Sequence, residues 1–263
     1  MKIALIQMDV ALGQVQVNQE KAKDLIDKAI TEGAKLIVLP ELWTTGYKLD
    51  EIDKMAESEN GQTIMMLRQI AKDNQVEIMT GSIAEARDGK VYNTSYAIDS
   101  AGTIQAKYSK IHLIGLMEED KFIAAGNKRS TFTMSFGKAG MIICYDLRFT
   151  ELSRALALDG CQTLFVSAEW PTVRGMHWRA LNIARAIENQ MYVIAVNRVG
   201  KDVNNNFFGH SMVIDPWGEV IAEGSETKEE VIMAEVDFTA VDEVRSKILV
   251  FADRRPECYE LKS

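Results

Sequence analysis

Residues 2–41 have the sequence KIALIQMDVALGQVQVNQEKAKDLIDKAITEGAKLIVLPE, in which two short apolar runs flank an amphipathic segment. The first run, Lys2 to Met8, predicts a β-strand, and the second, Lys35 to Leu39, predicts another. Between them, Asn18 is suited to cap a helix whose apolar residues recur at i, i+3, i+4, i+7 and i+8. The stretch therefore predicts a β–α–β unit, with Glu41 just beyond its second strand.

The rest of the chain continues this alternation of strands and helices and adds hairpins. Further strands are predicted at 76–84, 91–98, 103–108, 131–136, 139–144, 163–168, 192–199, 210–215 and 231–236, with helices around 64–71, 152–156 and 176–191. One hairpin turns at 99–102 and another at Gly137-Lys138. The last helix carries an apolar stripe from Met176 to Met191.

Helices that alternate with strands and hairpins predict two mixed β-sheets with helices outside them. If the hairpins pair into the sheets, the result is an α/β fold, a four-layer α-β-β-α sandwich. No Pro- or Ser-rich linker, low-complexity tract or internal repeat interrupts the chain. We therefore expect a single domain over residues 1–263.

The charge, the cysteine content and the apolar runs of the chain limit its binding partners and its compartment. The 263 residues include 38 acidic and 30 basic side chains, for a formal net charge of −8. Such a chain is poorly suited to phosphate backbones or anionic lipid, so we expect no nucleic-acid or membrane partner. Three cysteines without a CxxC pair argue against a disulfide framework or a zinc site and favour a reducing compartment. No apolar run reaches 18 residues, and the N-terminus resembles a first strand, so we expect a cytoplasmic protein.

Cys144 is the first candidate for chemistry. It ends the apolar run 141–143 and comes just before a helix-like segment. Free backbone N–H groups and the positive end of a helix dipole at such a place lower a cysteine pKa and stabilise an oxyanion. The alternative is inert packing, because free cysteine is among the most buried residue types.

Glu41 and Lys110 share the position of Cys144, at or just beyond the end of a predicted strand. Strand ends on one sheet edge are where α/β folds place their sites. Either residue alone could be a solvated surface charge. Together the three are chemically coherent, since a carboxylate can accept the thiol proton and an ammonium stabilises both a thiolate and an oxyanion.

Three sequence blocks now resemble a known family. Residues 39–42 (LPEL), 108–113 (YSKIHL) and 143–149 (ICYDLRF) resemble, in order and spacing, the signature blocks of the nitrilase superfamily of carbon–nitrogen hydrolases. Residues 184–189 and 209–219 look like the C-terminal half of such proteins. The resemblance therefore covers nearly the whole chain, and it implies the same α-β-β-α sandwich.

The resemblance also implies a Glu–Lys–Cys triad. Glu41 would be the general base, and Cys144 would attack an amide carbon to form a thioester. Lys110 and the backbone N–H of Tyr145 would stabilise the oxyanion. Ammonia would leave, and Glu41 would then activate the water that hydrolyses the thioester.

A fourth acid often supports such a site. Glu119 is the best match and Glu118 the alternative, while an exposed acidic cluster is the simpler reading of both. His112 follows the lysine block, so the sequence does not exclude a Cys–His pair, although a structural histidine is the preferred interpretation. The family implies no metal and no organic cofactor.

Within the superfamily, the block 143–149 followed by Trp170-Pro171 and His177-Trp178 looks most like the ω-amidase branch. Those enzymes hydrolyse the terminal amide of short dicarboxylic monoamides such as 2-oxoglutaramate and succinamate. One departure is Thr150, where the branch usually has proline. The rival activities on the same triad are deaminated-glutathione amidase, N-carbamoyl hydrolase and nitrilase, and a non-enzymatic scaffold is a weaker alternative.

A monoamide of a dicarboxylic acid requires a cation for its far carboxylate. Arg148 and Arg174 are the candidates, although Arg148 could instead pair with Asp146 or Glu151. Trp170 could line the pocket or pack in the core.

The resemblance further suggests a homodimer or larger homo-oligomer. Helices from the Cys144 and Trp170 region would pack across subunits. A C-terminal arm at about 251–263 would reach the neighbouring subunit, with a flexible tail as the alternative.

Overall fold

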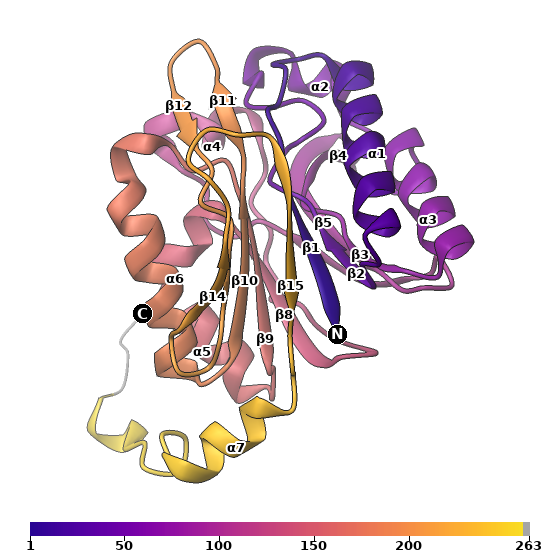
Figure 1. Cartoon of the computed structure of the whole chain (residues 1–263). Coiled ribbons are helices and arrows are strands. Elements are labelled where there is room, and N and C mark those ends of the chain that lie inside the picture. Colours follow the sequence, from indigo (N-terminus) through magenta and orange to yellow (C-terminus); the bar gives the residue numbers. More distant parts are fainter. Residues whose placement is uncertain (260–263) are drawn as a thin grey trace.

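A computed structural model describes residues 1–259 of the chain. It has two β-sheets packed face to face between two layers of helices, so the predicted α-β-β-α sandwich is confirmed (Figure 1). The larger sheet has the order β15-β1-β2-β3-β5-β4, with β6 also paired to β5. The smaller sheet has the order β14-β13-β10-β9-β8-β7.

The bounds of the strands are as follows. The larger sheet contains β1 (Lys2–Gln7), β2 (Leu36–Val38), β3 (Glu77–Met79), β4 (Ile83–Arg87), β5 (Lys90–Ile98), β6 (Ile104–Ser109) and β15 (Glu230–Glu235). The smaller sheet contains β7 (Thr131–Met134), β8 (Gly137–Ile143), β9 (Thr163–Ala168), β10 (Tyr192–Asn197), β13 (Met212–Ile214) and β14 (Val220–Glu223). A separate two-stranded hairpin contains β11 (Val199–Lys201) and β12 (Asn206–Phe208).

Two long helices cover each outer face (Figure 1). On the larger sheet these are α1 (Val15–Thr31) and α3 (Gln62–Asn74), and on the smaller sheet α5 (Thr150–Leu158) and α6 (Gly175–Asn189). Shorter helices are α2 (Ile52–Met55), α4 (Glu119–Phe122) and α7 (Ala240–Lys247). In the described residues, 1–259, no helix is long and apolar enough to cross a membrane.

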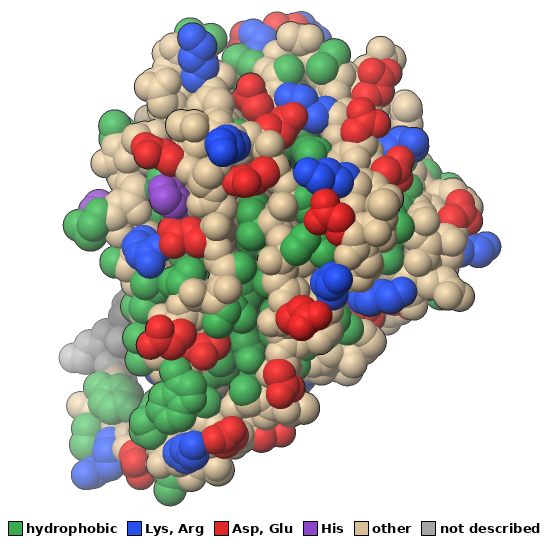
Figure 2. Space-filling view, viewed as in Figure 1, with side chains coloured by type: hydrophobic (Ala, Val, Ile, Leu, Met, Phe, Trp, Pro, Cys, Tyr) green, Lys and Arg blue, Asp and Glu red, His purple; other side chains and the backbone are tan. Residues whose placement is uncertain are grey.

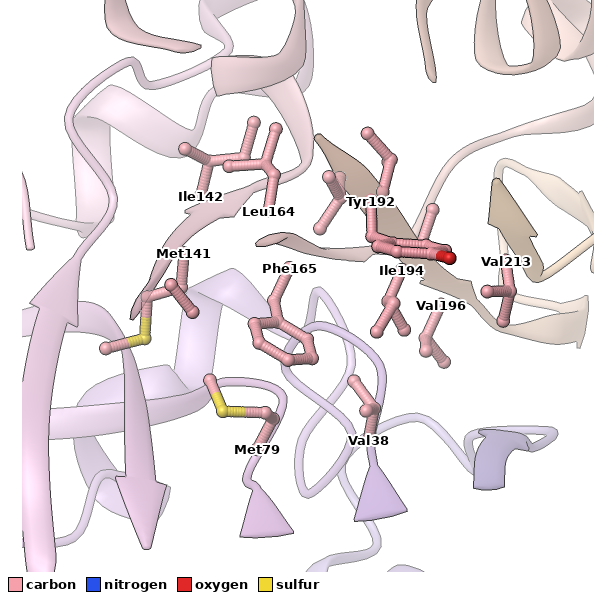
Figure 3. Packing of buried hydrophobic residues seen from close by; sticks show 14 of the residues in the cluster. Val38, Met79, Met141, Ile142, Leu164, Phe165, Tyr192, Ile194, Val196 and Val213 are labelled. Atoms are coloured by element: carbon pink, nitrogen blue, oxygen red, sulfur yellow. The ribbon is translucent and has the colours of Figure 1, made fainter. Parts of the chain in front are cut away.

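Strand alternation explains why both faces of the larger sheet are buried. In β1, Ile3 and Leu5 belong to the core between the sheets, whereas Ala4 and Ile6 belong to the core under α1 and α3. Figure 3 shows the inter-sheet core, where Val38 and Met79 of the larger sheet lie opposite Phe165 and other side chains of the smaller one. On the face shown in Figure 2, apolar side chains follow the seam between β14 and β15, where the two sheets meet.

Two local predictions in the N-terminal half, the Asn18 helix cap and the single strand 76–84, were wrong. Helix α1 begins at Val15, so Asn18 lies inside it. The Asn18 amide instead bonds the backbone N–H and C=O of Ala11 and the C=O of Thr44, and so ties two loops together. The predicted strand 76–84 is two strands, β3 and β4. It breaks at Gly81, where φ is +65° and an added Cβ would lie 2.0 Å from the Pro40 carbonyl oxygen.

Only part of the apolar stripe predicted from Met176 to Met191 faces the core: Met191 is fully buried and Ile183 packs against the hydrophobic core. Met176 and Ile187 are 74% and 50% exposed, while Trp178, Asn182 and Arg185 are buried. Arg185 is buried because its guanidinium donates two hydrogen bonds to the Leu147 carbonyl, at 2.7 and 3.2 Å. Arg185 therefore anchors the inward face of this helix together with the buried Trp178, and Met176 and Ile187 are left outside.

Smaller differences concern turns and the C-terminal half. Gly137 and Lys138 belong to β8, and the hairpin turns just before them. The predicted strand 192–199 ends at Asn197 and is followed by β11. Strands β12 and β14 and helix α7 were not predicted. Of the predicted arm, residues 260–263 lie outside the described residues, and Pro256–Cys258 forms a short 3-10 helix.

Candidate active site

Strand ends from both sheets meet at one end of the sandwich and carry the candidate residues. Glu41 follows β2, Lys110 follows β6 and Cys144 follows β8. Glu41 and Lys110 are fully buried and Cys144 is 7% exposed. The Lys110 ammonium lies 2.9 Å from Glu41 Oε1. The structure therefore brings together three residues that are 69 and 34 positions apart along the chain.

Cys144 sits on a sharp turn with an unusual backbone. Its φ is +47°, in the left-handed region that non-glycine residues rarely adopt. A 3-10 helix, Cys144–Arg148, starts at the same residue. Tyr145 is its second residue, and the first N–H groups of a helix have no partner within it. The turn thus places a thiol beside a free backbone donor.

Asp146 holds this turn. Its carboxylate is fully buried and accepts hydrogen bonds from the Ile143 N–H at 3.0 Å and from the Tyr108 hydroxyl at 2.7 Å. It also accepts the His112 backbone N–H at 2.9 Å. These bonds offset the strain at Cys144, which is worth about 1–3 kcal/mol for a residue in this region.

His112 is also engaged by Asp146. Its Nδ1 lies 2.7 Å from Asp146 Oδ1, and its ring stacks on Phe149 with a centroid distance of 3.5 Å. The geometry thus gives His112 a structural partner, and no hydrogen bond joins it to Cys144 in the described part of the chain.

The two oxygens of Glu41 have different surroundings. Oε1 accepts hydrogen bonds from Tyr47 Oη, Asn93 Nδ2 and Lys110 Nζ, at 2.7, 2.8 and 2.9 Å. Oε2 accepts the backbone N–H of Glu169, at 2.8 Å, and no other nitrogen donor among residues 1–259. A carboxylate oxygen offers about two acceptor positions, so Oε1 is saturated and Oε2 retains one. The free acceptor of Oε2 is the one suited to take a proton.

Glu119 lies against the same lysine. Both of its carboxylate oxygens are 2.9 Å from Lys110 Nζ, and Oε2 also accepts the Ile114 N–H at 2.9 Å. Glu118 is exposed and pairs instead with Lys121, at 2.6 Å. Of the two acids considered from the sequence, only Glu119 therefore contacts the buried cluster.

Burial and charge set the protonation states. Burial alone would raise the pKa of Glu41, but the charge and hydrogen bond of Lys110 outweigh it and the pKa is lowered. Burial would lower the pKa of Lys110, yet Glu41 and Glu119 raise it. Burial, with the charge of Glu41 added, raises the pKa of the Cys144 thiol, and Lys110 opposes this. The resting site therefore holds a carboxylate, an ammonium and a neutral thiol.

A narrow pocket lies over the thiol. Its lining includes Cys144, Tyr145, Arg148, Glu169, Trp170 and Arg174. The two arginines thus share one cavity with the candidate nucleophile.

Among the described residues, neither arginine has a carboxylate partner. Arg148 stacks 4.7 Å over the Trp170 ring and contacts His177 Nδ1 at 3.3 Å. Within residues 1–259 no ion pair joins Arg148 to Asp146 or Glu151, the two partners considered from the sequence. Arg174 likewise forms no ion pair there. Each guanidinium is therefore available to an anionic ligand.

Trp170 fulfils both roles considered from the sequence. It is 2% exposed and packs on Trp178, with ring centroids 5.6 Å apart. Its indole N–H donates to the Arg174 carbonyl at 2.8 Å, and its ring lines the pocket.

Four residues around the site were not found from the sequence: Tyr47, Asn93, Asp146 as a support of the turn, and Glu169. The polar run Asn93-Thr94-Ser95 inside a predicted strand was the available signal, because such residues at buried strand positions need partners. In the described residues, no group of three or more His, Cys, Asp or Glu side chains could hold a metal ion.

A sandwich of this kind, with a buried thiol, carboxylate and ammonium at one sheet edge, is typical of hydrolases that act through a covalent acyl-enzyme. A family model for carbon-nitrogen hydrolases matches residues 2–246. The chain belongs to this family, which confirms the resemblance to the nitrilase superfamily.

Three relatives illustrate the match. The chain is 42% identical over 257 residues to the 2-oxoglutaramate amidase of Bacillus subtilis (strain 168), covering 98% of each chain. It is 34% identical over 270 residues to the human omega-amidase NIT2, covering 99% of this chain and 97% of the relative. Among solved structures, Nit3 of Saccharomyces cerevisiae superposes with a TM-score of 0.88 at 31% identity, covering 94% of each chain.

Proposed function

We propose that this protein is an ω-amidase, which hydrolyses the terminal amide of small ω-dicarboxylic monoamides of the 2-oxoglutaramate and succinamate type. The observation that carries the proposal is the pair of guanidinium groups, Arg148 and Arg174, which line the pocket of the Cys144 thiol and have no carboxylate partner within residues 1–259. Two cations suit a substrate with a carboxylate at its far end. The names of the Bacillus subtilis and human relatives support the same substrate class.

The first step is attack on the amide. Because the pKa of Cys144 is raised and that of Glu41 lowered, a thiolate formed in advance would be unfavourable. The thiol proton therefore passes to Glu41 Oε2 as Sγ bonds to the carbonyl carbon. The carbonyl oxygen becomes an oxyanion, stabilised by the Lys110 ammonium and the Tyr145 N–H.

The second step releases ammonia. The tetrahedral intermediate collapses, the C–N bond breaks, and Glu41 returns the proton to the leaving nitrogen. A thioester on Cys144 remains. Glu41 then takes a proton from water, whose oxygen attacks the thioester carbon, and the proton returns to the thiol as the carboxylic acid leaves.

Supporting groups hold this machinery in place. Glu119 keeps Lys110 charged and fixed, while Tyr47 and Asn93 orient Glu41 through its Oε1. Preorganised charges of this kind need not reorient during the reaction, which is the main source of their effect.

An ammonia-release panel tests the proposal. Succinamate and 2-oxoglutaramate should be turned over faster than propionamide, which lacks the far carboxylate. Deaminated glutathione, N-carbamoyl amino acids and simple nitriles test the rival activities, and Cys144→Ala tests the scaffold alternative. Equal or better activity on propionamide contradicts the proposal.

We also propose a homodimer or larger homo-oligomer in the cytoplasm. The support is the apolar surface of α6 and the turn before it, where Val173, Met176 and Ile187 are 84%, 74% and 50% exposed. The described cysteines are all free, which suits a reducing compartment. Light scattering should show an assembly that Met176→Lys weakens and that Met65→Lys, on the exposed side of α3, leaves intact. An unchanged mass for Met176→Lys contradicts this interface.

A further inference from the structure

Glu169 is a buried acid beside the thiol that the steps above leave unused. It follows β9, and β9 lies between β8, which ends before Cys144, and β10, which ends before Arg198. Glu169 is fully buried and lines the same pocket as Cys144. Its place in the sheet thus puts a further carboxyl-bearing residue in the lining of the pocket over the thiol.

The two oxygens of Glu169 are not equivalent. Oε2 accepts a hydrogen bond from Arg198 Nη1 at 3.3 Å. Oε1 is buried and has no hydrogen-bond partner within residues 1–259. Leaving a buried acceptor without a donor costs free energy, more so for a charged group. An oxygen of this kind in a ligand pocket is suited to receive a donor from the ligand.

Arg198 fixes the orientation of this carboxyl group. Its other nitrogens donate to Asp9 Oδ1 at 3.1 Å, the Val10 carbonyl at 2.8 Å and the Val199 carbonyl at 3.0 Å. The guanidinium is fully buried. Because these bonds fix the Arg198 guanidinium, its bond to Oε2 fixes the Glu169 carboxyl group. Oε1 is then the oxygen that can accept a hydrogen bond from a ligand.

The position of the leaving nitrogen follows from Glu41. Glu41 Oε2 returns a proton to this nitrogen, so the nitrogen must lie within hydrogen-bond reach of Oε2. The same Oε2 accepts the Glu169 backbone N–H at 2.8 Å. The leaving nitrogen and the Glu169 backbone N–H therefore share one oxygen atom, Glu41 Oε2, as a hydrogen-bond partner.

We propose that Glu169 Oε1 accepts a hydrogen bond from the leaving amide nitrogen, and that this contact selects primary amides over esters of the same acid. The inference rests on the proposed amidase function. The nitrogen gains a proton and positive character as the C–N bond breaks, so the bond to a carboxylate strengthens in the transition state. An ester oxygen has no N–H to offer.

The charge state of Glu169 depends on pH, and the role requires the ionised carboxylate. Burial raises its pKa to about 8, Arg198 opposes the rise, and the charges of Glu41 and Asp202 add to it. The Arg148 and Arg174 guanidinium groups face the same pocket. An N–H donor in the pocket favours the ionised, accepting form.

Glu169→Gln tests the contact with little change of shape. Arg198 can only donate, so it takes the new amide oxygen and turns the NH₂ group toward the pocket. A donor then faces the substrate N–H. The measurement, made above pH 8 where Glu169 is ionised, is kcat/KM on succinamate and on monomethyl succinate, the methyl ester of the same acid, with Glu118→Gln as an exposed control.

We expect Glu169→Gln to lower kcat/KM on succinamate roughly ten- to hundredfold, as for the loss of a hydrogen bond to a charged group, with at most about a threefold change on the ester. Equal losses on both substrates would indicate a packing role and overturn the inference, as would an unchanged amide rate. If the wild-type protein releases no ammonia from succinamate, the proposed function is wrong and the inference falls with it.

A second measurement needs no variant. By microscopic reversibility, the site that holds the leaving nitrogen also holds an attacking amine. With the acyl-enzyme formed in advance from monomethyl succinate, the rate constant for its decay in single turnover should therefore saturate with hydroxylamine. A strictly linear dependence would count against an amine site at Glu169.

Discussion

Tyr47→Phe removes one hydroxyl from the centre of the buried charge cluster. That hydroxyl donates to Glu41 Oε1 at 2.7 Å and accepts from Lys110 Nζ at 3.0 Å. Lys110 has three N–H groups and, without Tyr47, still meets three acceptor oxygens, one of Glu41 and two of Glu119. The loss therefore acts mainly on Glu41.

The magnitude follows from the remaining donors. A hydrogen bond to a charged group is worth about 1.5–3 kcal/mol. Because Asn93 and Lys110 still bind Glu41 Oε1, we expect the lower end of that range. The corresponding loss in kcat/KM is about 10- to 30-fold. One fewer donor also raises the pKa of Glu41, so the acid limb of kcat/KM moves to higher pH.

The assay is ammonia release from succinamate across pH, with thermal melting of each variant. Tyr192→Phe is the matched control, since its hydroxyl donates to the Asp237 carbonyl at 2.8 Å, away from the site. The control should lose some stability and keep its activity. A Tyr47→Phe enzyme within twofold of wild type, with an unmoved acid limb, would refute the assigned role of Glu41 Oε1.

Three further changes test other parts of the molecule. Arg148→Met should raise KM for succinamate by roughly ten- to hundredfold, because one contact to the substrate carboxylate is lost, and should leave the kinetics on propionamide unchanged. An unchanged KM for succinamate in steady-state assays argues against Arg148 as a carboxylate ligand. Gly81→Ala should lower the free energy of unfolding, measured by urea titration, by about 3 kcal/mol or more, because the added Cβ would lie 2.0 Å from the Pro40 carbonyl oxygen. A smaller loss would mean that the turn can relax. Finally, kcat/KM for succinamate should rise as pH increases through about 8, where Glu169 ionises, and this rise should be absent in Glu169→Gln; a rise that persists in the variant assigns it to another group.

Local sequence signals predicted the strand ends well. Glu41 and Cys144 each follow a short apolar strand, and their positions could be inferred without knowing what lies opposite. Tyr47 and Asn93 could not be found in this way. They meet Glu41 only because β2, β5 and the loop after Glu41 come together in the folded protein.

Helix α6 shows a different limit. Its periodicity correctly predicts a helix, yet Met176 and Ile187 of the predicted apolar stripe lie outside, while Met191 is buried. Periodicity identifies an apolar face but not the surface that covers it. The inward face is fixed by Arg185 and its bonds to Leu147, a long-range contact that leaves no mark in the local sequence.

Trapping the covalent intermediate tests whether Cys144 forms a thioester with the acyl group of the substrate. The protein is mixed with succinamate, quenched in acid during turnover, and analysed by peptide mass spectrometry. We expect the wild-type protein to carry a succinyl group in thioester linkage on Cys144. The Cys144→Ala variant should show neither this adduct nor ammonia release. Ammonia release that persists in Cys144→Ala, or an acyl group found on a different residue, would contradict this role of Cys144.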